Sequence, residues 1–298
     1  MSKSNRTSKS SKHSAEFTNE LNQFIAVTNL PIKEATKFIT KYGKADLAID
    51  AYYNDPNALA SSSTAAARPP PVSNTKLNTL FDKYKAPDAT GTDQDIISID
   101  GTIRLCADLS VDPEDVVLLA VAYELKAPGV GEFTRAGWRE GWKTLGVESL
   151  AGMKNLLPTL RKNLASDYAY FKKVYLYTFE FARSEGQRSL AVDTAQAFWG
   201  LLMPHAVSGG ALAHVENDED EESEPDGTAG WNDDLTQMWF DFLNEKGGKG
   251  ISRDTWNQFV SFARTIDPTL EKHDSEGAWP STIDDFVEWA KGHRASSA

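Results

Sequence analysis

Residues 252–289 read SRDTWNQFVSFARTIDPTLEKHDSEGAWPSTIDDFVEW, and this stretch decides the fold. Ser252 predicts a helix N-cap, because apolar side chains follow it at the spacing of one helix face: Trp256, Phe259, Val260 and Ala263. Ser281 predicts a second N-cap, with Asp284 completing a capping box three residues later. The apolar stripe of this second helix consists of Ile283, Phe286, Val287 and Ala290. Three tryptophans in the stretch indicate that both helices pack into a core.

Carboxylates lie where these two helices are expected to begin. Asp254 belongs to the first turn of the first helix, Asp284 and Asp285 belong to the first turn of the second, and Ala278 lies in the loop between them. The helix dipole stabilises such acids by roughly 0.3–1 kcal/mol without any partner. The same acids around a small residue also form a shallow negative notch that fits a basic surface. The residues alone leave both interpretations open.

The rest of the chain predicts two helical units joined by a linker. Residues 15–56 have three apolar helical stripes and predict a compact three-helix unit. Residues 57–75, rich in Ser, Ala and Pro, predict a disordered linker. The larger domain covers residues 76–291, in which the segment 114–126 is apolar almost all round, as is typical of a central helix. No stretch shows sustained alternation of period two, so the predicted fold class is all-α.

The formal net charge of −12 is concentrated toward the C-terminal end. Eight acids lie between Glu216 and Asp226, so we expect residues 216–228 to form an acidic disordered insert. This charge makes nucleic acid a poor partner and would steer a basic protein toward the C-terminal part. No apolar run approaches the roughly 20 residues of a membrane span, and the N-terminal residues lack the apolar region of a signal peptide. Because the single cysteine cannot form an internal disulfide, we expect a reducing compartment, the cytoplasm or the nucleus.

The chain lacks the residues that conjugation chemistry or a metal site would need. One Cys and five His are too few for the ligands of a zinc ring. Cys106, flanked by Leu105 and Ala107, is expected to be a packed thiol. The acids between Asp82 and Asp100 have the wrong spacing for a calcium loop. We therefore predict no catalytic residue, no metal and no cofactor.

Several short motifs, in order and at matching spacing, carry a resemblance to a known family. Near the C-terminus they are Asp-Thr-Trp at 254–256, Gly-Ala-Trp-Pro at 277–280 and Ile-Asp-Asp-Phe-Val at 283–287. Upstream they include Ile99-Asp100-Gly101, Asp112-Pro113, Gly131-Glu132-Phe133, Leu145-Gly146, Phe179-Glu180-Phe181-Ala182-Arg183 and Phe198-Trp199. From Lys76 to Lys291 the chain resembles the defective-in-cullin-neddylation family. Residues 15–56 resemble a ubiquitin-associated domain in which Asn29-Leu30-Pro31 replaces the usual loop.

The resemblance implies a fold of EF-hand-like helix–loop–helix units without calcium ligands. It also implies a scaffold-type ligase for cullin neddylation, which promotes transfer of a ubiquitin-like modifier without catalytic residues of its own. The cullin's winged-helix region would bind at Asp254, Ala278, Asp284 and Asp285. The N-terminally acetylated conjugating enzyme would bind in a pocket formed by Ile99, Pro113, Leu118, Val121, Leu125, Phe133, Phe181, Phe198 and Leu201. On the residues alone each of these nine is more simply a core residue.

A different class of function stays open beside this one. In this alternative the protein is a non-catalytic adaptor that binds ubiquitin through residues 15–56.

Overall fold

The structure is a computed structural model that describes residues 7–28, 32–54, 72–85, 95–184, 186–216, 225–246, 248 and 250–297. It divides into two compact units, Met1–Pro71 and Val72–Ala298, here called unit 1 and unit 2. Within the described ranges, no helix is long and apolar enough to cross a bilayer. Most of the predicted linker lies outside those ranges, as does segment 217–224 of the predicted acidic insert.

Unit 1 consists of three helices around a small core: α1 (Thr7–Thr28), α2 (Ile32–Tyr42) and α3 (Ala45–Asn54). Phe24, Phe38 and Ile39 are buried at its centre, and the rings of Phe24 and Phe38 stack with their centroids 5.4 Å apart. The Glu20 carboxylate accepts the N–H of Ala45 at 2.6 Å, which ties α1 to the start of α3. α1 begins upstream of the predicted boundary at residue 15. The likeness of unit 1 to a ubiquitin-associated domain stays a prediction.

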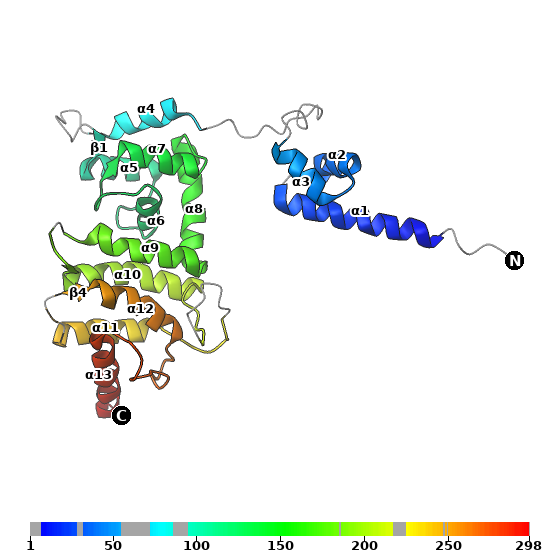
Figure 1. The fold of residues 1–298 in the computed structure, drawn as a ribbon. Coiled ribbons are helices and arrows are strands. Elements are labelled where there is room, and N and C mark those ends of the chain that lie inside the picture. The colour runs from blue at the N-terminus through cyan, green and yellow to red at the C-terminus, as the bar shows by residue number, and fades with distance from the viewer. Residues whose placement is uncertain are drawn as a thin grey trace. The chain divides into compact units, whose positions relative to one another are not determined.

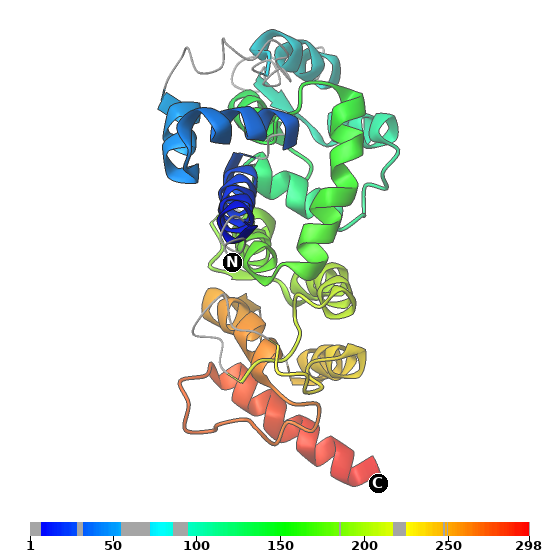
Figure 2. The same ribbon diagram turned by 90° about the vertical axis from the view of Figure 1, so that its right-hand side faces the viewer.

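Unit 2 is a stack of helices, with α4, α5 and α7 at one end and α11, α12 and α13 at the other (Figures 1 and 2). Helix α8 runs along one side, and α9 and α10 cross the middle (Figure 1). The helices are α4 (Asn74–Tyr84), α5 (Ile99–Leu109), α6 (Val117–Glu124), α7 (Arg135–Thr144), α8 (Leu150–Ser166), α9 (Tyr168–Ala182), α10 (Val192–Gly209), α11 (Asp233–Lys246), α12 (Arg253–Thr265) and α13 (Ser281–Ser297). This composition confirms the all-α fold class.

The only strands in the described ranges form two short antiparallel pairs. In the first pair, β1 (Ile96–Ile97) and β2 (Phe133–Thr134) join the chain before α5 to the chain before α7. In the second, β3 (Ser189–Leu190) and β4 (Ile251–Ser252) join the chain before α10 to the chain before α12. Each pair therefore fixes the starts of two helices against each other. The EF-hand-like character of these units stays a prediction.

Stacked aromatic rings in the core of unit 2 connect its middle to its C-terminal end. Trp256 of α12 stacks on Tyr175 of α9 with centroids 4.6 Å apart, and on Trp199 of α10 at 4.9 Å. The Trp256 indole N–H donates to the Tyr175 carbonyl at 3.0 Å, and the Tyr175 hydroxyl donates to the Trp256 carbonyl at 2.9 Å. All three rings are fully buried. Because close-packed interiors transmit strain, we expect the two ends of unit 2 to keep a fixed separation.

One of the two predicted N-caps is confirmed and the other is wrong. The Ser252 hydroxyl accepts the N–H of Thr255 at 3.0 Å, so Ser252 caps α12 as expected. Ser281, however, already lies inside α13, where the Pro280 carbonyl accepts the N–H of Ile283 at 2.8 Å. The Asp284 carboxylate bonds to a histidine in the preceding loop and does not complete a capping box. The carboxylate of Asp284 thus bonds to His273, 11 positions away, rather than to the start of its own helix.

Candidate functional site

An apolar cavity of about 560 Å³ opens between α5, α6, α9 and α10, with the loop before β2 on its rim. Seven of the nine predicted pocket residues line it: Ile99, Pro113, Leu118, Phe133, Phe181, Phe198 and Leu201. Large apolar side chains remain exposed around the opening, with 55% of Ile99, 49% of Ile103 and 55% of Val130 accessible to solvent. Exposed apolar surface of this kind around a cavity is typical of a binding site.

The other two predicted residues, Val121 and Leu125, do not line the cavity. Val121 is 1% exposed and Leu125 is fully buried, so both belong to the core of unit 2. Helix α6 is apolar on all sides, and its hydrophobic pattern therefore cannot show which side faces a cavity. The structure adds Leu119 and Ala122 of α6 to the lining, together with Thr102, Ile103, Val130, Gly131 and Ala197. Ile103 could have been found from the sequence, since it lies one helical turn after Ile99.

Two hydroxyl groups hold the loop that forms the rim of the cavity. The Tyr177 hydroxyl donates to the carbonyls of Ala127 and Ala122 at 2.5 and 3.1 Å, and the Thr102 hydroxyl donates to the carbonyl of Gly131 at 2.8 Å. Burial raises the pKa of Tyr177 to about 12, so its hydroxyl stays protonated and able to donate. The loop is thereby fixed to α5, α6 and α9, and the cavity is largely pre-formed.

Gly131 keeps one side of the opening clear. Its φ of +74° favours glycine, and a Cβ at this position would lie 3.0 Å from Ile99 Cγ1. A side chain at 131 would therefore strain the backbone and crowd Ile99, so glycine leaves the rim open.

The predicted cullin-binding residues, here called the acidic patch (Asp254, Ala278, Asp284 and Asp285), lie on α12, α13 and the loop between them. Asp254 is exposed in the first turn of α12, Asp285 is exposed just after the first turn of α13, Ala278 is exposed in the loop, and Asp284 is partly exposed in the first turn of α13. The Asp284 carboxylate lies 2.9 Å from Nε2 of His273, whose side chain is only 4% exposed. Asp284 therefore anchors the loop as well as presenting a charge.

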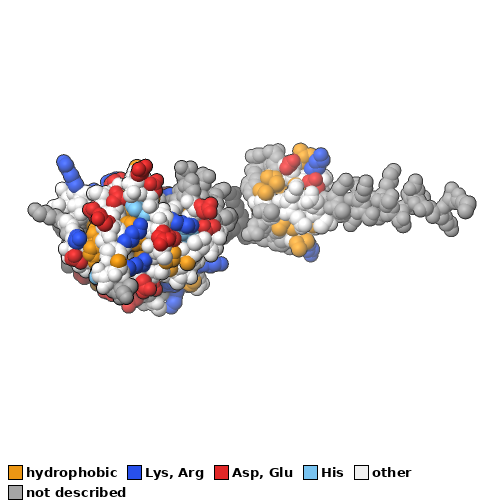
Figure 3. Space-filling model, turned by 90° about the horizontal axis from the view of Figure 1, so that it is seen from below, with side chains coloured by type: hydrophobic (Ala, Val, Ile, Leu, Met, Phe, Trp, Pro, Cys, Tyr) orange, Lys and Arg blue, Asp and Glu red, His pale blue; other side chains and the backbone are white. Residues whose placement is uncertain are grey.

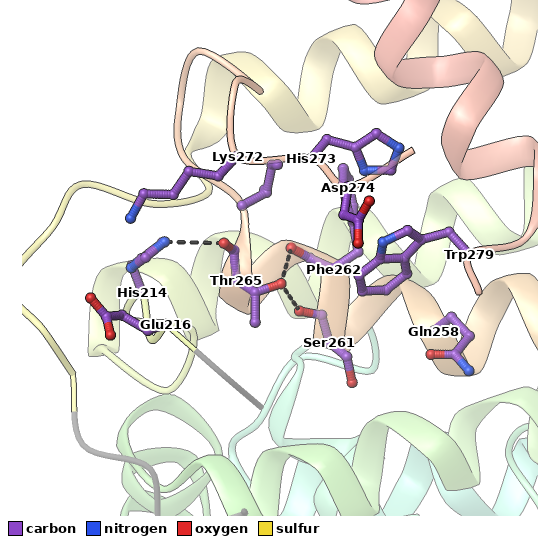
Figure 4. A pocket seen from close by; sticks show the side chains of 11 residues that line it. His214, Glu216, Gln258, Ser261, Phe262, Thr265, Lys272, His273, Asp274 and Trp279 are labelled. Atoms are coloured by element: carbon purple, nitrogen blue, oxygen red, sulfur yellow. Dashed lines mark hydrogen bonds between the residues drawn. The ribbon is translucent and has the colours of Figure 1, made fainter. Parts of the chain in front are cut away.

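Neighbours of three patch residues line one hollow of about 600 Å³, which has both polar and apolar side chains in its wall. Gln258 lies one helical turn after Asp254, Trp279 follows Ala278, and His273 bonds to Asp284. Figure 4 shows Gln258 and Trp279 on one side of this hollow, with Lys272 and His214 on the other. The hollow thus connects the surroundings of Asp254, Ala278 and Asp284.

Asp285 follows Asp284 directly in the chain but belongs to a different hollow. It lines a second hollow, together with Phe242 of α11 and with Trp289 and His293 of α13. The rings of Trp289 and His293 stack there with centroids 4.8 Å apart. On the end of unit 2 that carries α13, acidic side chains alternate with Lys and Arg, so the surface is mixed rather than uniformly acidic (Figure 3).

The first part of the loop that carries Ala278 is held by contacts from two directions. Near α12, the Asp267 carboxylate accepts the N–H of Thr269 at 3.0 Å and that of Lys272 at 2.7 Å. Burial alone would raise the pKa of Asp267, but the hydrogen bonds donated to its carboxylate outweigh burial and lower the pKa to about 2. From α13, the Arg294 guanidinium donates to the Pro268 carbonyl at 2.7 Å. Sequence reasoning did not single out Asp267, although its partners lie two and five positions away, whereas the Arg294 contact spans 26 positions.

His214 fixes the chain on either side of segment 217–224. Its Nδ1 lies 2.9 and 3.0 Å from the two carboxylate oxygens of Asp226, and its Nε2 lies 3.1 Å from the Thr265 carbonyl. Hydrogen bonds with Thr228 and His214 outweigh partial burial and lower the pKa of Asp226. This end of the predicted acidic insert is therefore attached to the C-terminal end of α12.

Comparisons with known proteins give one consistent picture. A family model described as "Cullin binding" matches residues 152–289, which include the acidic patch and the α9–α10 side of the cavity. The chain is 38% identical over 278 residues to "Defective in cullin neddylation protein 1" of Cryptococcus neoformans, which covers 90% of this chain and 92% of that protein. A protein of the same name in Mycosarcoma maydis is 33% identical over 322 residues, or 93% of this chain and 95% of the relative. Human "DCN1-like protein 5" is 29% identical over 224 residues, covering 75% and 81%.

Proposed function

The chain belongs to the defective-in-cullin-neddylation family, and from this premise we propose that it is a scaffold-type co-factor of cullin neddylation. The observation that carries the proposal is the presence of two different surfaces on one packed unit. The apolar cavity lies at α5, α6, α9 and α10, and the acidic patch lies at α12 and α13. A scaffold needs such an arrangement because it must hold two partners at a fixed separation.

In this proposal the acidic patch binds the basic winged-helix region of a cullin. Asp254 and Asp285 present exposed carboxylates, and Ala278 leaves room between the helix ends. Complementary charge across such a surface steers encounter and fixes register. Lys and Arg side chains lie among the acidic ones on this end of unit 2 (Figure 3), so individual carboxylates, rather than a uniformly negative surface, would determine binding.

The apolar cavity binds the acetylated N-terminal methionine of the conjugating enzyme. An apolar cavity admits a neutral acetamide whose hydrogen bonds are met, whereas burying an unpaired ammonium costs several kcal/mol. Acetylation of the enzyme would thus decide entry.

No residue of this chain takes part in bond chemistry in this proposal. The gain in rate comes from the proximity and orientation of the bound cullin and the conjugating enzyme that carries the modifier. We place this activity in the cytoplasm and the nucleus, in agreement with the single, buried Cys106. The adaptor alternative is not favoured, because the family match lies in unit 2, although ubiquitin remains a proposed further partner of unit 1.

A reconstituted transfer assay tests the proposal. Purified cullin and conjugating enzyme loaded with the modifier are combined with and without this protein, and the initial rate of cullin modification is measured. We expect the protein to raise the rate, and to do so only when the conjugating enzyme is N-terminally acetylated. An unchanged rate with both forms of the enzyme would overturn the scaffold function.

A further inference from the structure

Two carboxylates, those of Glu114 and Asp115, lie in the lining of the otherwise apolar cavity. Asp115 is neutralised within the fold, because its carboxylate lies 2.7 Å from the Arg161 guanidinium and accepts the N–H of Val117 at 2.9 Å. Its charge is therefore already satisfied before any ligand enters.

The Glu114 carboxylate has no such partner. Its backbone N–H donates to the Asp112 carboxylate at 2.8 Å, which fixes the turn before α6. Its side chain is exposed and makes no hydrogen bond or ion pair with any residue in the described part of the chain. Because the side chain is exposed, its charge is accessible to solvent. A segment that fills the cavity would displace part of that solvent, and an unpaired charge would then oppose binding.

We propose that Glu114 selects a lysine or arginine side chain in the segment that enters the cavity. The inference rests on the proposed function, in which the conjugating enzyme's N-terminal segment is the ligand, and it adds a specificity determinant to that site. The neutral acetylated end occupies the apolar interior, beside Leu118 and Phe198. The cationic side chain follows it and pairs with Glu114 at the opening, where the lining carries no basic side chain to compete.

The pairing also predicts what the cavity disfavours. An acidic residue at the same position of the ligand would be repelled by Glu114, since like charges brought together in a partly desolvated site oppose binding. The selection should weaken as salt is added, because the pair lies near the surface and is screened.

Calorimetry with the full chain and synthetic peptides tests the inference. Each peptide begins with acetyl-methionine. In one series a single lysine is placed in turn at each position after the methionine, and in the matched series an uncharged norleucine takes its place. We expect wild type to prefer lysine over norleucine by roughly 3- to 5-fold at one position. Glu114→Gln should remove this preference. Glu140→Gln, which changes an exposed carboxylate on α7 outside the cavity, should keep it.

Reversing the charge at residue 114 gives a second measurement, whose expected result would not arise from a general loss of structure. Glu114→Lys should reverse the preference, so that a peptide with glutamate at the selected position binds better than one with lysine. A lysine preference that survives Glu114→Gln, or its absence at every position in wild type, would overturn the inference while leaving the cavity's function intact. Failure of every acetylated peptide to bind wild type would instead overturn the proposed function, and this inference with it.

Discussion

The two candidate sites of unit 2 differ in how far each depends on the hydrophobic core. The apolar cavity is lined by side chains that also build the core, such as Phe133 and Phe181, which are 4% and 7% exposed. The acidic patch projects from the core, with Asp254 and Asp285 exposed at helix starts. Substitutions at Asp254 or Asp285 should therefore change binding with only a small change in stability, whereas most substitutions at the cavity should change both.

The largest expected effect is at the patch. Asp254→Arg replaces an exposed carboxylate with a cation facing a basic partner, and like charge at an interface costs several kcal/mol. We expect cullin binding to fall below detection in calorimetry while the circular dichroism spectrum stays unchanged and the melting temperature falls by only a few degrees, because the first turn of α12 loses a dipole stabilisation of roughly 0.3–1 kcal/mol. Asp284→Lys should also abolish binding, but it removes the hydrogen bond to His273 as well, so Asp254→Arg is the cleaner variant.

Glu140→Arg is the matched control, because it makes the same change of charge at an exposed position on α7. It should leave cullin affinity close to that of wild type. Wild-type affinity in a folded Asp254→Arg variant would show that the patch does not bind the cullin.

The loop that carries Ala278 should lose stability in acid. Asp267 has a folded-state pKa of about 2, below its ordinary value of 3.8. The stabilisation, on the order of 2 kcal/mol, is therefore fully present above pH 3.8 and is lost as the pH falls toward 2. Asp267→Asn should remove this dependence, which is measured by urea unfolding at a series of pH values. Identical pH profiles for wild type and variant would contradict the role of Asp267.

A smaller effect is expected when threonine replaces an apolar residue of the core or of the cavity, and the two replacements should have different consequences. Val121→Thr places a hydroxyl in the core, at a cost of roughly 1–3 kcal/mol if it stays unpaired, and should lower stability without changing peptide affinity per folded molecule. Leu201→Thr changes a partly buried residue that lines the cavity, and should weaken binding of an acetylated peptide with a smaller loss of stability. Thermal unfolding and calorimetry on both variants measure the two quantities. Weaker peptide binding by folded Val121→Thr would place Val121 at the cavity after all.

The sequence predicted what local interactions determine. The N-cap at Ser252 and the buried face of α12 follow from residues within three or four positions of one another. Seven cavity residues were also named correctly as neighbours, but through family resemblance, because their hydrophobicity alone could not distinguish cavity from core. Their binding role stays a prediction.

Contacts between distant residues account for what the sequence did not predict. The bond between His273 and Asp284 spans a loop, and it replaced the local capping box expected at Ser281. The side of α6 that faces the cavity depends on where α5 and α10 pack, and a helix that is apolar all round carries no signal of that choice. The hollow that Asp285 lines likewise depends on the position of α11, which contributes Phe242 to it.

The smallest expected effect concerns unit 1. Deletion of residues 1–71 should leave the rate of cullin modification in solution unchanged, because both candidate sites lie in unit 2. Deletion of residues 1–75 is a sharper comparison, since it also removes Ser73, whose hydroxyl caps α4 and whose N–H donates to Glu148 at 2.6 Å. Loss of such a cap costs roughly 1 kcal/mol, so the longer deletion should lower the melting temperature and the shorter one should not. Loss of most activity in the 1–71 deletion, with its melting temperature intact, would show that unit 1 takes part in the transfer complex.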